Sequence, residues 1–188
     1  VVDPNTIRRI VALAGVGPGD RVVEIGPGLG SLTLGLLEAG AEVTAVEIDE
    51  RVLPALEEVT GGRARIVAGD ALQVDWRDLA GPGAMVVANL PYNVATPLVL
   101  RLLDEVPAID RLLVMVQREV GERMAAAPGS RTYGIPSVKV AFWAKARLVG
   151  TVPAEVFHPR PRVTSALVEI VRRAEPVAPV EPGLLFEL

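Results

Sequence analysis

The sequence predicts an α/β fold, in which a doubly wound, mostly parallel sheet of seven strands carries an antiparallel hairpin at one edge. Short apolar runs alternate with amphipathic stretches over the first two thirds of the chain, a pattern typical of βαβ units. Two apolar runs near the C-terminus follow each other without a helix, which favours an antiparallel pair. The 188 residues suffice for one domain with a sizeable core.

The first helix is expected to open at Asp3-Pro4 and to end after Ala14, because Pro suits a first turn and the glycines that follow end a helix. Gly40 suits the position just beyond a second helix, where a left-handed backbone is common. The further elements expected before residue 90 are strands 21–25, 42–47, 64–68 and 84–88, helices 31–39 and 50–59, and a short helix near Trp76.

The helix after the fourth strand is expected to take Thr96 as its N-cap, with Pro97 in its first turn, and to reach about Glu105. The remaining expected elements are strands 111–116, 146–152 and 163–171, helices 118–126 and 136–144, and a loop at 128–131. Ligands of such sheets bind beyond the carboxyl ends of the strands. The residues just after each strand are therefore the candidates for function.

Composition excludes several classes of protein. A hydrophobic fraction of 50% and a mean hydropathy of +0.38 exclude a disordered chain, yet no apolar run reaches the ~18–20 residues of a membrane span. No secretion signal is recognisable. The absence of Cys and the single His158 exclude disulfides, thiol catalysis and most transition-metal sites, so no metal site is predicted. The chain is expected to be a soluble, cytoplasmic monomer.

The charges are unevenly distributed. The net charge is −4, but residues 1–110 hold 8 Arg against 16 acidic residues, whereas residues 111–173 hold 11 basic residues against 4 acidic ones. Such asymmetry is typical of a protein that reads a nucleic acid and also binds a small ligand. A solvated charged face would explain the charges equally well.

A glycine-rich turn follows the first strand. Gly26, Gly28 and Gly30 allow a tight turn and close approach of a ligand to a helix N-terminus, although the spacing is that of neither a pyrophosphate-binding loop nor a P-loop. Glu47 ends the second strand, where its carboxylate can accept from both hydroxyls of a ribose. Asp70 ends the third strand, where a carboxylate can accept from an adenine amino group. Each acid alone could be an ordinary strand-end residue. Together they favour a nucleoside without a diphosphate, such as S-adenosylmethionine.

The fourth strand ends in Asn89-Leu90-Pro91-Tyr92. Pro91 restricts the backbone so that the Asn89 amide oxygen and the Leu90 carbonyl can point the same way. Two such acceptors can hold both hydrogens of an exocyclic amine, and the Tyr92 ring offers a face on which a base can stack. The alternative is a plain Asn-Pro turn with a core tyrosine.

These residues together resemble the S-adenosylmethionine-dependent methyltransferases that act on adenine amino groups. Leu90, where others have a second Pro, is similar to the ribosomal RNA adenine dimethyltransferases of the kasugamycin-sensitivity type, which are Rossmann-like class I methyltransferases. The further motifs that carry the resemblance are 116–120, 128–131, 133–138 and the Phe-x-Pro-x-Pro-x-Val-x-Ser segment within 157–166. The resemblance covers essentially the whole chain.

The resemblance implies dimethylation of N6 on two adjacent adenosines in a hairpin loop near the 3′ end of small-subunit rRNA during ribosome maturation. It implies catalytic roles for Asn89, Leu90, Pro91 and Tyr92, with Phe157 on the other face of the base; the alternative for Phe157 is a plain core residue. His158 is a bystander in that loop. The cofactor-binding residues implied are Val1, Gly26, Gly28, Gly30, Glu47, Ile48, Asp70, Ala71 and Asn89.

Several alternatives remain at this point. The macrolide-resistance methyltransferases of large-subunit rRNA are close relatives, while DNA adenine and protein glutamine methyltransferases usually carry Pro at the position of Leu90. A non-catalytic RNA-binding assembly factor is the alternative outside the enzymes. An assay of methyl transfer to rRNA and to duplex DNA separates these readings.

The candidates for binding RNA phosphates are Arg118, Arg123, Arg131, Lys139, Lys145, Arg147, Arg160 and Arg162. The methyltransferase domain is expected to span residues 1–175. Compared with the family, a basic N-terminal segment is expected to be missing before Val1, and residues 176–188 are expected to link to an absent helical domain. Such trimming would weaken RNA binding more than the chemistry.

Overall fold

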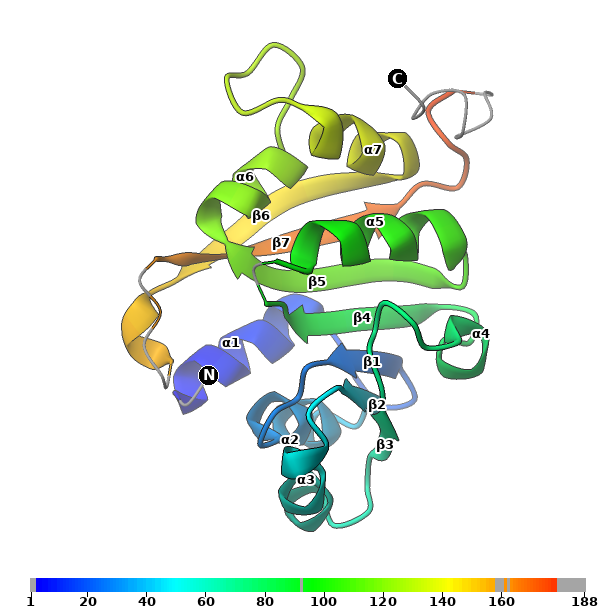
Figure 1. The fold of residues 1–188 in the computed structure, drawn as a ribbon, viewed down its shortest axis with the longest axis vertical. Coiled ribbons are helices and arrows are strands. Elements are labelled where there is room, and N and C mark those ends of the chain that lie inside the picture. The colour runs from blue at the N-terminus through cyan, green and yellow to red at the C-terminus, as the bar shows by residue number, and fades with distance from the viewer. Residues whose placement is uncertain (1–2, 92, 158–160, 162, 179–188) are drawn as a thin grey trace.

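The computed structural model describes residues 3–91, 93–157, 161 and 163–178. Within them, seven strands form one sheet in the order β3-β2-β1-β4-β5-β7-β6 (Figure 1). The parallel strands are β1 (Arg21–Ile25), β2 (Glu42–Glu47), β3 (Arg65–Ala68), β4 (Ala84–Asn89) and β5 (Ile109–Gln117). β7 (Ser165–Arg172) is antiparallel to β5 and to the edge strand β6 (Ala144–Val152). The predicted fold class is confirmed.

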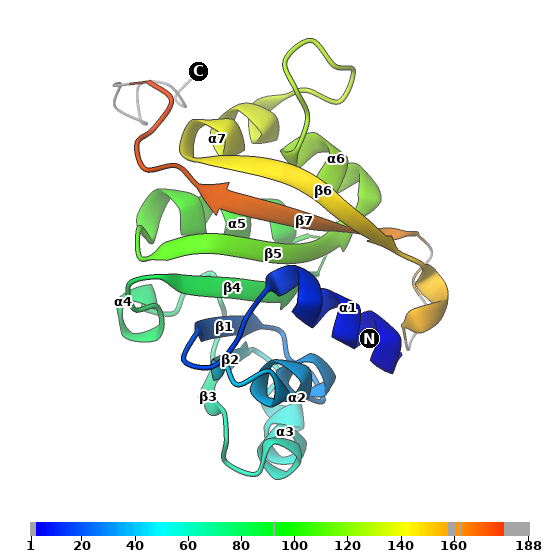
Figure 2. The same ribbon diagram turned by 180° about the vertical axis from the view of Figure 1, so that it is seen from behind.

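Helices cover both faces of this sheet (Figures 1 and 2). They are α1 (Pro4–Ala14), α2 (Ser31–Glu38), α3 (Leu53–Thr60), α4 (Trp76–Leu79), α5 (Ala95–Glu105), α6 (Arg118–Met124) and α7 (Ile135–Trp143), with 3₁₀ turns at η1 (Glu50–Val52) and η2 (Ala154–Val156). α1 and α2 pack on one face through Ile10 and Leu36. α4, α5 and α7 pack on the other, where Leu98 and Val140 are buried. Two apolar layers therefore enclose the parallel strands.

The ends of α1 show how local sequence sets an element. Asp3 is the N-cap, and its Oδ2 accepts hydrogen bonds from the backbone N–H of Thr6 at 2.7 Å and from the Thr6 hydroxyl at 2.6 Å. Gly15 ends the helix with φ 61°, a conformation that favours glycine. The predicted extent of this helix is confirmed, and Gly40 likewise has the expected positive φ, 91°.

Two predictions about helix starts were wrong. α5 begins at Ala95, one residue before the expected cap Thr96, because the carbonyl of Pro91 accepts from the N–H groups of Val94 and Ala95 at 3.2 and 3.1 Å and opens the helix earlier. The single helix expected at 50–59 is a 3₁₀ turn capped by Asp49 and followed by α3. Pro54 explains the break, since it has no N–H to donate back to residue 50.

The strand order places a switch point between β1 and β4. β1 pairs with β2 on one side and with β4 on the other, although β2 and β3 intervene in the chain. The turns that leave the two strands therefore diverge at their carboxyl ends, the position at which doubly wound sheets bind ligands.

One arginine of the basic C-terminal part has a structural position. The guanidinium of Arg172 donates to the carbonyls of Leu102, Leu103, Val106 and Ile109 at 2.7 to 3.1 Å, so it ties the end of α5 to the start of β5. Burial lowers the pKa of Arg172, an effect that nearby Asp110 opposes. Part of the positive charge in residues 111–173 thus stabilises the fold.

In the part of the chain that the structure describes, no helix is both long and apolar enough to cross a membrane. Residues 179–188, most of the stretch expected to be a linker, lie outside the described residues.

Candidate active site

Backbone hydrogen bonds between neighbouring strands bring the strand-end residues to one edge of the sheet. The N–H of Gly26 donates to the carbonyl of Val46 at 3.0 Å, and the N–H of Gly69 donates to Glu47 at 2.9 Å. The N–H of Leu90 donates to Met115 at 3.0 Å. The turns after β1, β3 and β4 are therefore each fixed to the adjacent strand, and their side chains share one edge, as the sequence predicted.

The turn after β1 has the backbone that its glycines permit. Gly26, Gly28 and Gly30 have φ values of 69°, 56° and 83°, all in the left-handed region. A Cβ at Gly28 would meet no atom within 4 Å, whereas one at Gly30 would lie 2.9 Å from Leu56 Cδ1. A side chain at Gly30 would therefore displace Leu56 and would also have to adopt a positive φ, whereas Gly28 leaves open space beside the turn.

Glu47 fastens this glycine turn to the end of β2. Its Oε2 accepts from the N–H of Gly28 and its Oε1 from the N–H of Asp49, both at 3.0 Å. The side chain is buried, and each carboxylate oxygen retains a second lone pair. The carboxylate can therefore accept two further hydroxyl groups without losing its structural bonds. Ile48, the next residue, is 67% exposed and adds an apolar surface beside it.

Asp70 is partly buried at the end of β3. Its Oδ1 accepts from the N–H of Leu72 at 2.8 Å and its Oδ2 from the Gln73 side chain at 3.3 Å. The Gln73 bond is long and exposed, so a ligand can replace it. Ala71 is buried, and its carbonyl accepts from the Trp76 indole at 3.0 Å, which fixes this turn.

The end of β4 presents two acceptors that no described residue uses. The Asn89 side chain is partly exposed and forms no hydrogen bond with a described residue, and the Leu90 carbonyl accepts none from a described residue. The Leu90 side chain is buried, which fixes the backbone at this point. Ala88 pairs with Ile25 in the register of β4 and β1, so Asn89 and Gly26 are the residues that come next after this pair. A Cβ on Gly26 would lie 3.7 Å from the Asn89 carbonyl oxygen. The backbone of Asn89 thus adjoins the glycine turn.

The remaining predicted residues are placed less fully. Phe157 is partly buried and packs against the core cluster of α1 and α2, so at least part of its ring serves the core. Arg118, Arg123 and Arg131 are exposed on α6 and the loop after it, and Lys139 is partly buried on α7. Val1, Tyr92, His158, Arg160 and Arg162 lie outside the described residues.

Sequence reasoning missed Glu24, which lies on β1 beneath the glycine turn. Burial raises the pKa of the Glu24 carboxyl to about 7; the Thr33 hydroxyl opposes the rise and nearby Glu47 adds to it. Both Glu24 Oε2 and Thr33 Oγ1 are buried, and neither forms a well-aligned hydrogen bond with a described residue. An acid within the apolar run Val22–Ile25 was the available signal.

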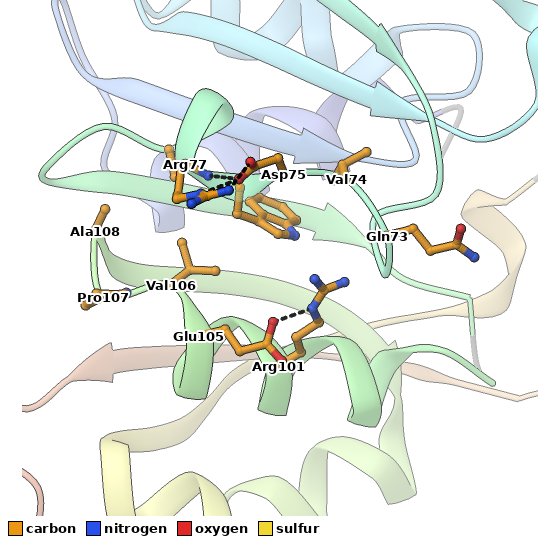
Figure 3. Close-up of a pocket in the computed structure, with 11 residues that line it drawn as sticks. Gln73, Val74, Asp75, Arg77, Arg101, Glu105, Val106, Pro107 and Ala108 are labelled. Carbon is orange, nitrogen blue, oxygen red and sulfur yellow. Dashed lines mark hydrogen bonds and ion pairs between the residues drawn. The ribbon is translucent and has the colours of Figure 1, made fainter.

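A hollow of about 600 Å³ lies at the other end of the sheet (Figure 3). Ala80 precedes β4 and Pro107 precedes β5, so these lining residues are near the amino ends of the strands. Its two arginines are neutralised locally, since Arg77 pairs with Asp75 at 2.6 Å and Arg101 with Glu105 at 2.7 Å. None of the predicted site residues lines this hollow.

Comparison with known proteins decides the family. A family model described as ribosomal RNA adenine dimethylase matches residues 1–186. The chain belongs to this family. The resemblance drawn from the sequence motifs is thereby confirmed.

Two curated relatives of this dimethylase family are named ribosomal RNA small subunit methyltransferase A. The protein from Corynebacterium jeikeium is 53% identical over 97% of this chain and 61% of its own length. The protein from Streptomyces coelicolor is 53% identical over 94% of this chain and 64% of its own length. The chain therefore spans less than two thirds of the length of these relatives.

Solved structures agree with this membership. A dimethyladenosine transferase from Plasmodium falciparum has a TM-score of 0.82 at 28% identity and covers 91% of this chain, which covers 62% of that one. The 23S rRNA methyltransferase ErmE has a TM-score of 0.80 at 30% identity, over 95% of this chain and 71% of that one.

Proposed function

We propose that this protein transfers methyl groups from S-adenosylmethionine to N6 of two adjacent adenosines, in a hairpin loop near the 3′ end of small-subunit rRNA, during maturation of the small subunit in the cytoplasm. The observation that carries the proposal is the pair of acceptors at Asn89 and Leu90, which no described residue uses, next to a glycine turn held by Glu47. The names of the curated relatives, ribosomal RNA small subunit methyltransferase A, support small-subunit rRNA as the substrate.

The residues present fit S-adenosylmethionine. Glu47 has two free lone pairs for the ribose hydroxyls, and the exposed Ile48 supplies an apolar surface for the adenine. The open space beside Gly28 would admit the cofactor close to the backbone, and Asp70 would accept from the adenine amino group. When bound, S-adenosylmethionine supplies an electrophilic methyl group on a sulfonium.

We expect the Glu47→Ala substitution to weaken S-adenosylmethionine binding by ~1.5–3 kcal/mol, the contribution of hydrogen bonds to a charged group. Calorimetric titration measures the change. The control is Glu50→Ala, which removes the same charge from an exposed residue three positions away. An unchanged dissociation constant for Glu47→Ala, with the variant shown to be folded, would remove Glu47 from the cofactor site.

Asn89 and Leu90 supply the positioning that an adenine amino group requires. The lone pair of that nitrogen is delocalised into the ring, so the free base is a poor nucleophile. In the first transfer, the Asn89 amide oxygen and the Leu90 carbonyl accept both N–H hydrogens, which holds the nitrogen with its lone pair, perpendicular to the ring, directed at the methyl group and stabilises the positive charge that develops on the nitrogen. The methylated nitrogen is acidic, so its proton passes to solvent without a strong base in the protein.

The target adenosine must leave its stack, at a cost of a few kcal/mol. We propose that Tyr92 and the exposed part of the Phe157 ring offset this cost by stacking on the two faces of the base.

ErmE keeps one alternative open, the methylation of large-subunit rRNA. The curated small-subunit relatives are 53% identical to this chain, whereas ErmE is 30% identical, and this difference favours the small subunit.

The test is transfer of a radiolabelled methyl group to immature small subunits, to large-subunit rRNA and to duplex DNA. We expect label in small-subunit RNA alone, and digestion of that RNA should yield N6,N6-dimethyladenosine. Label confined to large-subunit rRNA or to DNA would contradict the proposed substrate, and no label in any acceptor would contradict the proposed activity.

A further inference from the structure

We propose that the hollow between α6 and the 125–134 loop is a subsite for one unpaired nucleotide of RNA, with the Tyr133 ring stacked on its base and Arg123 and Arg131 on its phosphates. This inference rests on the proposed action on RNA. The hollow has a volume of about 700 Å³, within the size range of small-ligand pockets. Its lining residues come from α6, from the loop that Figure 1 draws in yellow-green between α6 and α7, and from the start of α7.

The two arginines of this hollow differ from most others in the protein. Arg118, Arg147, Arg77 and Arg101 all form salt bridges, and Arg172 is bonded to carbonyls. Among the described residues, the guanidinium groups of Arg123 and Arg131 form neither a salt bridge nor a hydrogen bond. Both are exposed and line the same hollow. Their charges are therefore available to a phosphate.

The hollow of Figure 3 shows the contrast. Its arginines, Arg77 and Arg101, each have a carboxylate partner that lines the same hollow. Near Arg123 and Arg131, the Glu122 carboxylate is engaged with Arg118 at 2.7 Å. Glu119 is the other acid that lines this hollow. Its carboxylate can accept from the exocyclic amino group of a base.

The loop that carries Tyr133 is held by short-range hydrogen bonds. The Ser137 hydroxyl donates to the Arg123 carbonyl at 2.5 Å and accepts from the N–H of Gly134 at 3.1 Å, which ties the start of α7 to α6. The N–H of Tyr133 donates to the Ser130 carbonyl at 3.1 Å. The ring is thereby presented from a fixed backbone, and the residue is 37% exposed.

An exposed aromatic ring with free cations on the same hollow suits single-stranded RNA. Stacking on a ring requires a base that is not enclosed in a duplex, and arginine binds phosphate in a bidentate manner. α6 begins directly after β5, whose carboxyl end is bonded to the turn after Asn89. A strand of RNA whose adenosine reaches Asn89 can therefore continue along α6 to this hollow.

The test measures the affinity of the protein for a fluorescein-labelled ten-nucleotide oligo(A) over a range of salt concentrations. We expect Tyr133→Ala to weaken binding about tenfold, as for the loss of one stacked base, and Tyr133→Phe to bind like the unaltered protein. Arg131→Ala should weaken binding and reduce the log–log salt slope by about 0.7. Arg77→Ala is the matched control, since it removes an exposed but ion-paired arginine, and should leave both values unchanged.

Thermal unfolding of each variant establishes whether it is folded. If Tyr133→Ala does not fold, the binding measurements on Arg131→Ala test the proposal. Unchanged affinity and slope in Arg131→Ala, or equal losses in Tyr133→Phe and Tyr133→Ala, would overturn the subsite. Methyl transfer by the unaltered protein is measured separately. If rRNA is methylated but the variants bind oligo(A) normally, the subsite alone is wrong. If the variants bind oligo(A) weakly but no rRNA is methylated, the proposed function alone is wrong.

Discussion

Asn89→Ala is expected to reduce the rate of methyl transfer by roughly 10²-fold or more, the cost of losing one preorganised group that stabilises developing charge. The side chain forms no hydrogen bond with a described residue and is partly exposed, so its removal costs the fold little. The backbone of residue 89 remains paired with β5 opposite Met115. Single-turnover transfer at saturating cofactor measures the effect on the chemical step itself.

The matched control is Asn93→Ala, the same substitution at an exposed position four residues further along. It should leave the rate near that of the unaltered protein. Asn89→Ala should also retain most of its affinity for S-adenosylmethionine, in contrast to Glu47→Ala, so the two variants separate catalysis from cofactor binding. A folded Asn89→Ala protein with near-normal turnover would show that the amide does not position the amine.

The sequence predicted the architecture well because the local signals agreed with the final packing. Apolar strands, glycine turns and caps all indicated the same alternation, and the predicted boundaries of most elements lie within two residues of those observed. The predicted helix boundaries were wrong where a backbone hydrogen bond, or the backbone chemistry of one residue, determines where the helix begins. The start of α5 depends on the Pro91 carbonyl, and the break before α3 depends on the missing N–H of Pro54.

The position of the candidate site was predictable for a topological reason. In a parallel sheet, residues that follow different strands meet at one edge, so Gly26, Glu47, Asp70 and Asn89 could be grouped from their spacing alone. Their partners were not predictable. That Glu47 binds the Gly28 N–H and that Asp70 closes its own turn depends on how the loops fold.

The charge pattern indicated a surface, but it gave no information on which charges are free. Arg147 lies opposite Glu169 in the β6–β7 register and is paired with it at 2.6 Å. Arg172 binds the end of α5 through the carbonyls of Leu103 and Leu102, which lie 69 and 70 positions earlier in the chain. Only three-dimensional structure separates these arginines from Arg123 and Arg131, which is why the sequence treated Arg147 and Arg131 alike.

Glu24 is expected to make the free energy of unfolding depend on pH between about 4.5 and 7. Burial raises the pKa of this carboxyl from its ordinary 4.5 to about 7 in the folded protein. In that interval the unfolded chain is ionised and the folded protein keeps the proton, so stability is highest at low pH and falls as pH rises. One pKa unit corresponds to about 1.4 kcal/mol, so the loss approaches ~3 kcal/mol by pH 8.

Glu24→Gln removes this titration while keeping the shape of the side chain. We expect urea unfolding to show that the stability of Glu24→Gln relative to the unaltered protein rises by ~2–3 kcal/mol between pH 5 and pH 8. Asp49 and Asp75, whose pKa values their neighbouring arginines lower to about 2, titrate below this range, and His158 is present in both proteins. Because only the change with pH is compared, any constant cost of the Gln amide cancels. Parallel stability curves for the two proteins from pH 5 to pH 8 would show that Glu24 is ionised in the folded state throughout.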